Sequence, residues 1–197
     1  MEPQRLGKLL PCLVINLALA ACQVPSVTPS SQVWSSAPHT VSIPADVQYL
    51  AVFHPHVSVR SIADGYLRLE GIAFRLRDLR PALHILERQQ LDHLLLVQQQ
   101  ELRASVSEES ALRVARLLGV DAFLFFEIHS YRHDPEAVQI TITSKLVHLE
   151  SGEVLFQSVV LSRAVRTPGT VERWTTQLAL DQAIAQMATD LQHAFLF

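Results

Sequence analysis

The chain has 197 residues, of which 49% are hydrophobic and 18% charged, and its formal net charge is -3. This length suits one domain with a sizeable core and is too short for two domains with linkers. The acidic balance argues against a nucleic-acid partner bound by phosphate neutralisation. The only two cysteines, Cys12 and Cys22, lie near the N-terminus, so neither a disulfide nor a cysteine metal site is predicted in the body of the fold.

The first 22 residues have the pattern of a secretory signal. Positive residues precede an apolar run over residues 9–19, which is too short to span a bilayer. The segment closes with Leu19, Ala20, Ala21 and Cys22. These four residues resemble the bacterial lipobox, in which a leucine and two small residues precede a cysteine that is lipidated.

The lipobox resemblance implies that residues 1–21 are removed as a signal peptide and that acyl chains on Cys22 hold the mature chain in a membrane. Gln23 follows the cysteine, where lipoproteins of the inner membrane commonly carry aspartate. The expected location is therefore the outer membrane, with the chain facing the periplasm. The alternative is an ordinary secretory signal that ends in a cysteine by chance.

The mature chain is predicted to be a tether followed by one domain. Residues 22–40 are rich in Pro, Ser and Thr without a regular period, which predicts a disordered tether, and the domain covers 41–197. In chain order, the pattern predicts a strand at 47–53, a helix at 62–79, a strand at 82–87, a short helix around 91–102, a helix between Ser107 and Gly119, strands at 120–131, 138–146 and 154–161, and a last helix after Pro168.

This element order is β-α-β-αα-β-β-β-α. Two crossovers between parallel strands and a closing meander predict an α/β domain with a mixed five-stranded sheet covered by helices. The strand at 120–131 is placed in the centre of the sheet because both of its faces are apolar.

Three segments of the domain, Ile85–Leu95, Glu109–Tyr131 and Ile142–Phe156, resemble the CsgG-type family of curli production assembly/transport lipoproteins. The LpoB-type lipoproteins, which activate penicillin-binding proteins, are related to this family. The resemblance implies a fold like the anticodon-binding domain, a place in the outer membrane and a role without enzymatic activity. It also marks Glu87, Arg88 and Gln89 as residues of a loop or of a subunit contact.

The two branches of the family imply different roles. A curli-type channel subunit donates two long β-hairpins to a ring, and the turns at 132–137 and 164–170 are too short to hold them. An LpoB-type activator reaches across the periplasm, whereas the tether at 22–40 measures about 25 Å as a coil. The predicted function is a lipid-anchored periplasmic interaction module in envelope assembly, either in peptidoglycan synthase regulation or beside a secretion apparatus. The alternative is a subunit of a curli-type oligomeric channel, and the expected partner is an envelope protein or another copy of the chain.

Histidines and one glutamate are the residues with the most chemical potential. His54 and His56 offer two imidazoles to a metal, but zinc needs three or four ligands. His129 and His133 lie on a strand and its turn, which spreads them apart. Glu127 interrupts an apolar strand, and a buried carboxylate there would pair with an arginine or lie where the sheet ends, with a catalytic acid as the alternative. No catalytic or cofactor motif occurs, so no enzyme activity, cofactor or metal is predicted.

Large apolar residues of the last helix raise the question of what they contact. Trp174 begins a stripe at helical spacing, which is more typical of a core than of a binding groove. The chain end carries Phe195, Leu196 and Phe197, which are expected to dock onto this domain or onto a neighbour.

Overall fold

A computed structural model of the protein describes residues 31–36, 39–40, 43–54, 60–86, 91, 93, 107–134, 136–166 and 172–196. In chain order its elements are β1 (Ser31–Ser35), β2 (His39–Thr40), β3 (Tyr49–Phe53), α1 (Arg60–Leu79), β4 (His84–Leu86), α3 (Glu108–Leu118), β5 (Ala122–Asp134), β6 (Ala137–His148), β7 (Val154–Val165) and α4 (Glu172–Leu196). Among these described residues, no helix is both long and apolar enough to cross a membrane.

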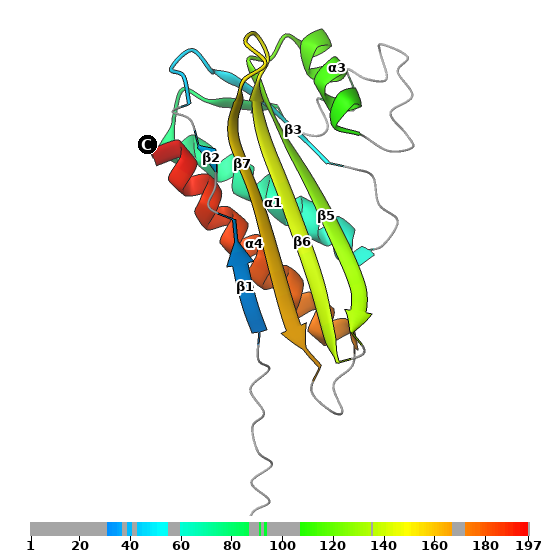
Figure 1. Ribbon diagram of the computed structural model, residues 1–197. Helices are drawn as coiled ribbons and strands as arrows, with labels where there is room; N and C mark the ends of the chain where they lie inside the picture. The colour runs from blue at the N-terminus through cyan, green and yellow to red at the C-terminus, as the bar shows by residue number, and fades with distance from the viewer. Residues whose placement is uncertain are drawn as a thin grey trace, which may run out of the picture.

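All strands belong to one mixed sheet in the order β1-β7-β6-β5-β3-β4, with β2 also paired to β7 (Figure 1). Strand β3 runs parallel to β4 and β5, and the β5-β6-β7 meander is antiparallel. The predicted crossovers and meander are thus confirmed. The predicted count of five strands is wrong, because β1 and β2 add to the edge of the sheet beyond β7.

Strand β5 separates two apolar cores, which confirms its predicted central place. Leu124 and Phe126 point into a core shared with α1 and α4. Phe123 and Phe125, which alternate with them, point into a smaller core beneath α3. Because successive side chains of a strand point to opposite faces, a run that is apolar at every position suits a strand buried on both sides.

Helix α3 has the capping residues that the sequence predicts at both of its ends. The Ser107 hydroxyl accepts a hydrogen bond from the Ser110 N–H, and Glu108 and Glu109 lie in the first turn, where the helix dipole favours negative charge. At the other end Gly119 adopts a left-handed conformation with φ of 65°, and its N–H reaches the last carbonyls of the helix.

Helix α1 approaches the sheet closely at a glycine. A Cβ atom on Gly65 would lie 3.1 Å from Ile128 Cδ1 and 3.2 Å from Leu180 Cδ2, so any larger residue would require these two side chains to move. The predicted helix at 62–79 is confirmed by α1. The predicted helix around 91–102 lies outside the described residues, apart from positions 91 and 93, which are helical.

Strands β1 and β2 fall within the segment 22–40, which is predicted to be a disordered tether, so that prediction is wrong for these strands. Their order comes from distant parts of the chain: β1 pairs with Val160–Ala164 and β2 with Phe156 and Gln157 of β7. Residues 22–30 lie outside the described part of the chain.

Candidate interaction surface

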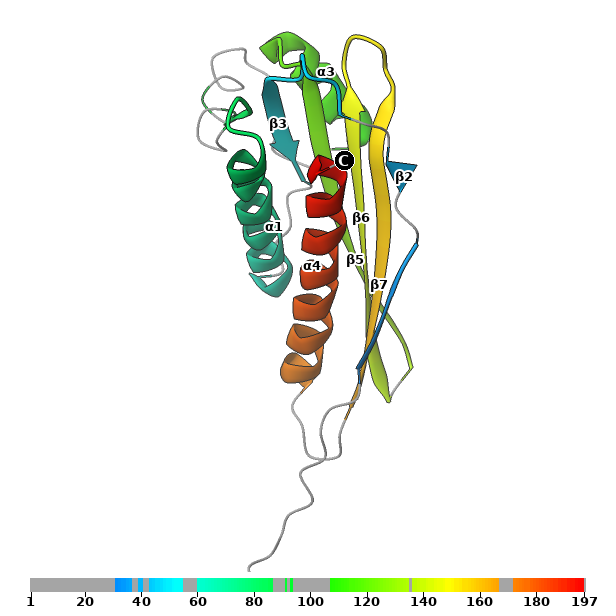
Figure 2. The ribbon, with the colours of Figure 1, turned by 90° about the vertical axis from the view of Figure 1, so that its left-hand side faces the viewer.

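The two faces of the sheet are covered unequally. Helices α1 and α4 lie side by side along one face (Figure 2). On the other face α3 packs only over one end of the sheet, against β5 and the start of the β6–β7 hairpin (Figure 1). The remainder of that face, over the middle of the meander, is covered by no described helix.

Within this uncovered region we call seven residues the open sheet face: Trp34, Glu127, His129, Thr141, Thr143, Val159 and Leu161. They form two rows across neighbouring strands. In the first row Trp34 lies opposite Leu161, and Thr141 lies between Leu161 and His129. Directly opposed residues point to the same side of a sheet, so each row presents one continuous strip of side chains.

The strips combine apolar and β-branched side chains with substantial exposure. Trp34 is 46% exposed, and Thr143, Val159 and Leu161 are only half-buried. Aromatic and aliphatic side chains that gather on an uncovered sheet face mark a surface suited to contact with another protein. Sequence reasoning missed this surface because it assigned Trp34 to the tether.

Glu127 lies on the open sheet face and its side chain is 44% exposed, so it is not the buried, arginine-paired carboxylate that the sequence offers as one alternative. Phe123 and Phe125 point to the same side of β5 as Glu127. These two phenylalanines lie beneath α3, whereas Glu127 lies beyond the part of the face that α3 covers. The Glu127 Oε2 atom lies 3.5 Å from Nε2 of His129. His129 is therefore engaged with a carboxylate, and the side chain of His133 lies outside the described residues.

A buried carboxylate of α4 fixes the strand that carries Trp34. The Ser35 hydroxyl donates to Asp190 Oδ2 (2.7 Å), and the Ser158 hydroxyl of β7 donates to the same oxygen (2.6 Å). Asp190 is only 5% exposed, and Gln186 donates to its other oxygen (2.9 Å). These bonds hold β1 against the body of the fold and place Trp34 on the opposite side.

His54 takes part in a cluster between β3, α1 and β5. Its Nε2 atom lies 2.9 Å from Glu70 Oε1, and its ring stacks on Tyr66 with the ring centroids 4.4 Å apart. The Tyr66 hydroxyl accepts a hydrogen bond from the Ile128 N–H (2.7 Å), and burial of the phenol raises the pKa of Tyr66 to about 12. This arrangement gives His54 a structural role, and the second imidazole of the weighed metal pair, His56, lies outside the described residues.

The other residues singled out in the sequence lie outside the described part of the chain: Leu19, Ala20, Ala21, Cys22, Glu87, Arg88, Gln89 and Phe197. Their assignments as lipobox, lipidation site, loop or subunit contact and docking end stay predictions.

The last helix divides its large residues between core and solvent. Trp174 is 71% exposed, so its predicted place in the core is wrong: the neighbouring Thr175 takes the buried position in this first turn. Toward the chain end Phe195 packs against the main core and Leu196 is exposed. Of the two predicted docking sites for the chain end, Phe195 uses this domain itself.

No protein-family model and no curated protein matches the sequence. The PelC dodecamer from Paraburkholderia phytofirmans has a partly similar structure, with 14% identity and a TM-score of 0.44 over 85% of this chain and 97% of that one. The LpoB C-terminal domain from Salmonella enterica has 15% sequence identity and a TM-score of 0.38, over 61% of this chain and 84% of that one. Lipoprotein GNA1162 from Neisseria meningitidis has 12% sequence identity and a TM-score of 0.43, over 72% of this chain and 98% of that one. TM-scores below 0.5 carry no conclusion about this chain, so its family stays a prediction from its own segments.

Proposed function

We propose that this protein is a lipid-anchored module of the bacterial envelope that acts by binding another protein, without catalysis. The observation that carries the proposal is the open sheet face, which presents Trp34, Val159 and Leu161 where no described helix covers the sheet. A protein partner that covers these side chains would remove apolar surface from water.

The attachment of the domain supports a partner close to the outer membrane. If Cys22 carries the lipid, only residues 23–30 separate it from β1, and they reach at most about 29 Å when fully extended. On the same fully extended measure, a tether of residues 23–40 would reach about 60 Å. The proposal therefore favours an accessory of an assembly at the outer membrane, such as a secretion apparatus, over an activator that reaches a synthase across the periplasm.

An exposed tryptophan supports an orientation in which the start of β1 lies toward the membrane. Strand β1 and helix α4 begin at the same end of the molecule (Figure 1), and Trp174 lies in the first turn of α4 with 71% of its surface exposed. Tryptophan side chains favour the boundary between water and lipid, where the ring is partly buried and its N–H stays hydrated. The end that carries Trp174 would thus face the membrane.

The alternative, a curli-type channel subunit, has less support. The turn between β5 and β6 extends only from Asp134 to Ala137, which leaves no room for a long inserted hairpin. The second position considered for such a hairpin, 164–170, lies largely outside the described residues.

Substitution of the lipidated cysteine tests the anchor. We expect Cys22→Ala to move the protein from the membrane fraction to the soluble periplasmic fraction, because no acyl chain can then be attached. Cys12→Ala is the matched control, since Cys12 lies within the segment predicted to be removed, and it should stay in the membrane fraction. Membrane retention of Cys22→Ala would contradict lipidation as the anchor.

Photocrosslinking in cells tests the binding face. A benzoylphenylalanine placed at Thr143, on the open sheet face, should give a discrete crosslinked product in which mass spectrometry identifies one other envelope protein. The same group at Arg75, which is exposed on α1, should give none. A product from Arg75 alone would overturn the proposal. A product that contains only this chain would replace it with the homo-oligomer reading.

A further inference from the structure

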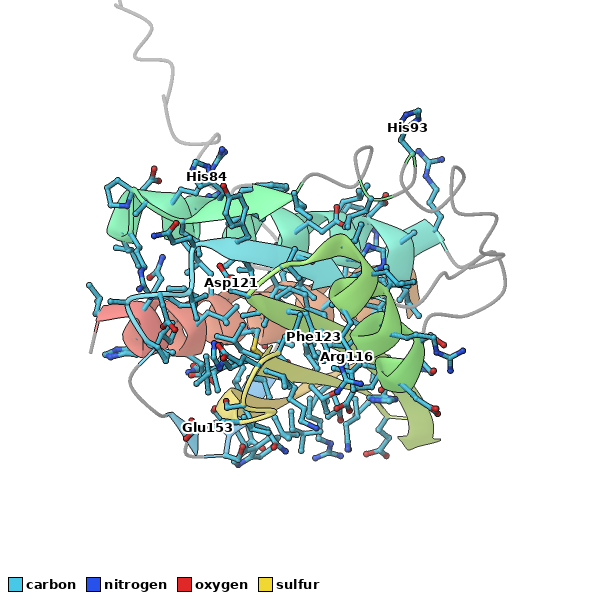
Figure 3. All side chains as sticks on the ribbon, turned by 90° about the horizontal axis from the view of Figure 1, so that it is seen from above. His84, His93, Arg116, Asp121, Phe123 and Glu153 are labelled. Carbon is cyan, nitrogen blue, oxygen red and sulfur yellow. The ribbon has the colours of Figure 1, made fainter. Side chains whose placement is uncertain are left out.

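Three side chains from two separate segments bring metal-binding atoms together at the end of the sheet where the β6–β7 hairpin turns. Asp46 lies in the segment before β3, His148 ends β6, and Glu150 lies in the turn toward β7. One ligand atom of each residue lies within 4.8 Å of the other two. Figure 3 looks down on this end of the sheet, with Asp121 and Glu153 labelled.

The histidine of this cluster is held in place. His148 is only 9% exposed, and its Nδ1 atom lies 2.9 Å from the hydroxyl of Ser151 in the same turn. In the tautomer in which Nδ1–H donates a hydrogen bond to the Ser151 hydroxyl, the lone pair of Nε2 is left to bind a metal. A hydrogen bond of this kind to the second ring nitrogen is the usual way in which proteins orient a histidine ligand.

The two segments that carry the carboxylates are also fixed relative to each other. The Asp121 carboxylate accepts hydrogen bonds from the backbone N–H groups of Gln48 and Tyr49 (2.8 Å each), close to Asp46 in sequence. The Asp121 carbonyl accepts another from the N–H of Leu149 (2.8 Å), next to Glu150. Asp121 thus joins the two segments and leaves Asp46 and Glu150 to face each other with exposed side chains.

We infer that Asp46, His148 and Glu150 form a binding site for a divalent metal ion of the zinc class. One imidazole nitrogen and two carboxylate oxygens suit Zn²⁺, which binds such ligands at about 2.0–2.2 Å and keeps a fourth position open when the protein supplies three. Exposed carboxylates can rotate to reach those distances around the fixed imidazole. A bound ion would tie the chain before β3 to the β6–β7 hairpin. The inference rests on these residues alone and is independent of the open sheet face.

Calorimetric titration of the full chain in detergent with ZnCl₂ at pH 7 tests the site. We expect both Asp46→Asn and His148→Gln to abolish the binding of one zinc ion or to lower its affinity at least tenfold. Saturating zinc should raise the melting temperature of the unaltered protein. Glu153→Gln is the matched control, because Glu153 is an exposed carboxylate of the same hairpin outside the cluster, and it should bind as the unaltered chain does.

Each contrary result has a definite meaning. Asp46→Asn changes an exposed side chain, so it keeps the test decisive even if His148→Gln fails to fold. Unchanged zinc binding in Asp46→Asn, or an equal loss in Glu153→Gln, would overturn the site. Tighter binding of Ca²⁺ than of Zn²⁺ would overturn the assigned metal class, because calcium prefers oxygen ligands alone.

Discussion

Replacing Asp190 with alanine is expected to lower the free energy of unfolding by about 1–3 kcal/mol and to loosen β1 from the sheet. The carboxylate accepts hydrogen bonds from Ser35, Ser158 and Gln186, and Ser158 is fully buried. Without the acceptor, the Ser158 hydroxyl would stay inside the protein with no partner for its proton. Denaturation in urea would measure the first effect, and hydrogen–deuterium exchange over residues 31–36 the second.

A second aspartate of α4 gives the matched control for Asp190. Asp181 is 44% exposed and pairs with Arg68, so Asp181→Ala should cost less than about 1 kcal/mol, as surface ion pairs do. Adding Ser158→Ala to Asp190→Ala should recover part of the lost stability, because the buried hydroxyl is then gone. Equal losses for Asp190→Ala and Asp181→Ala, or unchanged exchange in β1, would show that Asp190 does not hold the strand.

The elements that could be predicted from the sequence are those whose pattern reports burial directly. The alternation in β6 and the apolar run of β5 each state which faces are covered, and both strands form where they are expected. Helix α3 carries its own signals at both ends, Ser107 and Gly119, which need no distant partner. Such local signals survive folding because the neighbours that they require are close in the chain.

The errors arise where distant residues decide the outcome. Strand β1 has the sequence SQVWS, which has no strong local preference, and its order depends on β7 and on Asp190, which lies 155 residues from Ser35. The apolar strand around Glu127 allows a buried carboxylate, but α3 covers the sheet only as far as Phe125 and leaves Glu127 on the open part of the face. The helical spacing that includes Trp174 does not reveal that the core begins one position later, at Thr175.

The two candidate sites could not be predicted from the sequence because each one is assembled from distant segments. The open sheet face takes residues from four strands, and the metal cluster joins Asp46 to a hairpin about a hundred residues further along the chain. The spacing of His54 and His56 favours a surface turn over a metal site, whereas in the structure His54 turns inward to Glu70 and Tyr66. Sequence spacing identifies ligand sets that lie on one element and misses sets that the sheet topology assembles.

Removal of the Tyr66 hydroxyl is expected to destabilise the fold through the backbone of β5. Ile128 lies beyond Phe125, the last residue of β5 that pairs with β3, so its N–H needs another acceptor and finds it in the Tyr66 hydroxyl. Tyr66→Phe keeps the ring that stacks on His54 but leaves this buried N–H without a partner. We expect a loss of about 1–3 kcal/mol in the free energy of unfolding, measured in urea at pH 8.

The dependence of stability on alkaline pH should reveal the contribution of the Tyr66 hydroxyl. The pKa of Tyr66 is raised from 10.0 to about 12, so between those values the unfolded chain loses the phenol proton while the folded chain keeps it. Stability therefore falls as pH rises, by up to about 3 kcal/mol from this group, and Tyr66→Phe lacks that part of the loss. The stability gap between the unaltered protein and Tyr66→Phe should accordingly shrink from pH 10 to pH 12. A stability gap that stays constant for Tyr66→Phe between pH 10 and pH 12 would mean that the phenol is not protected by burial.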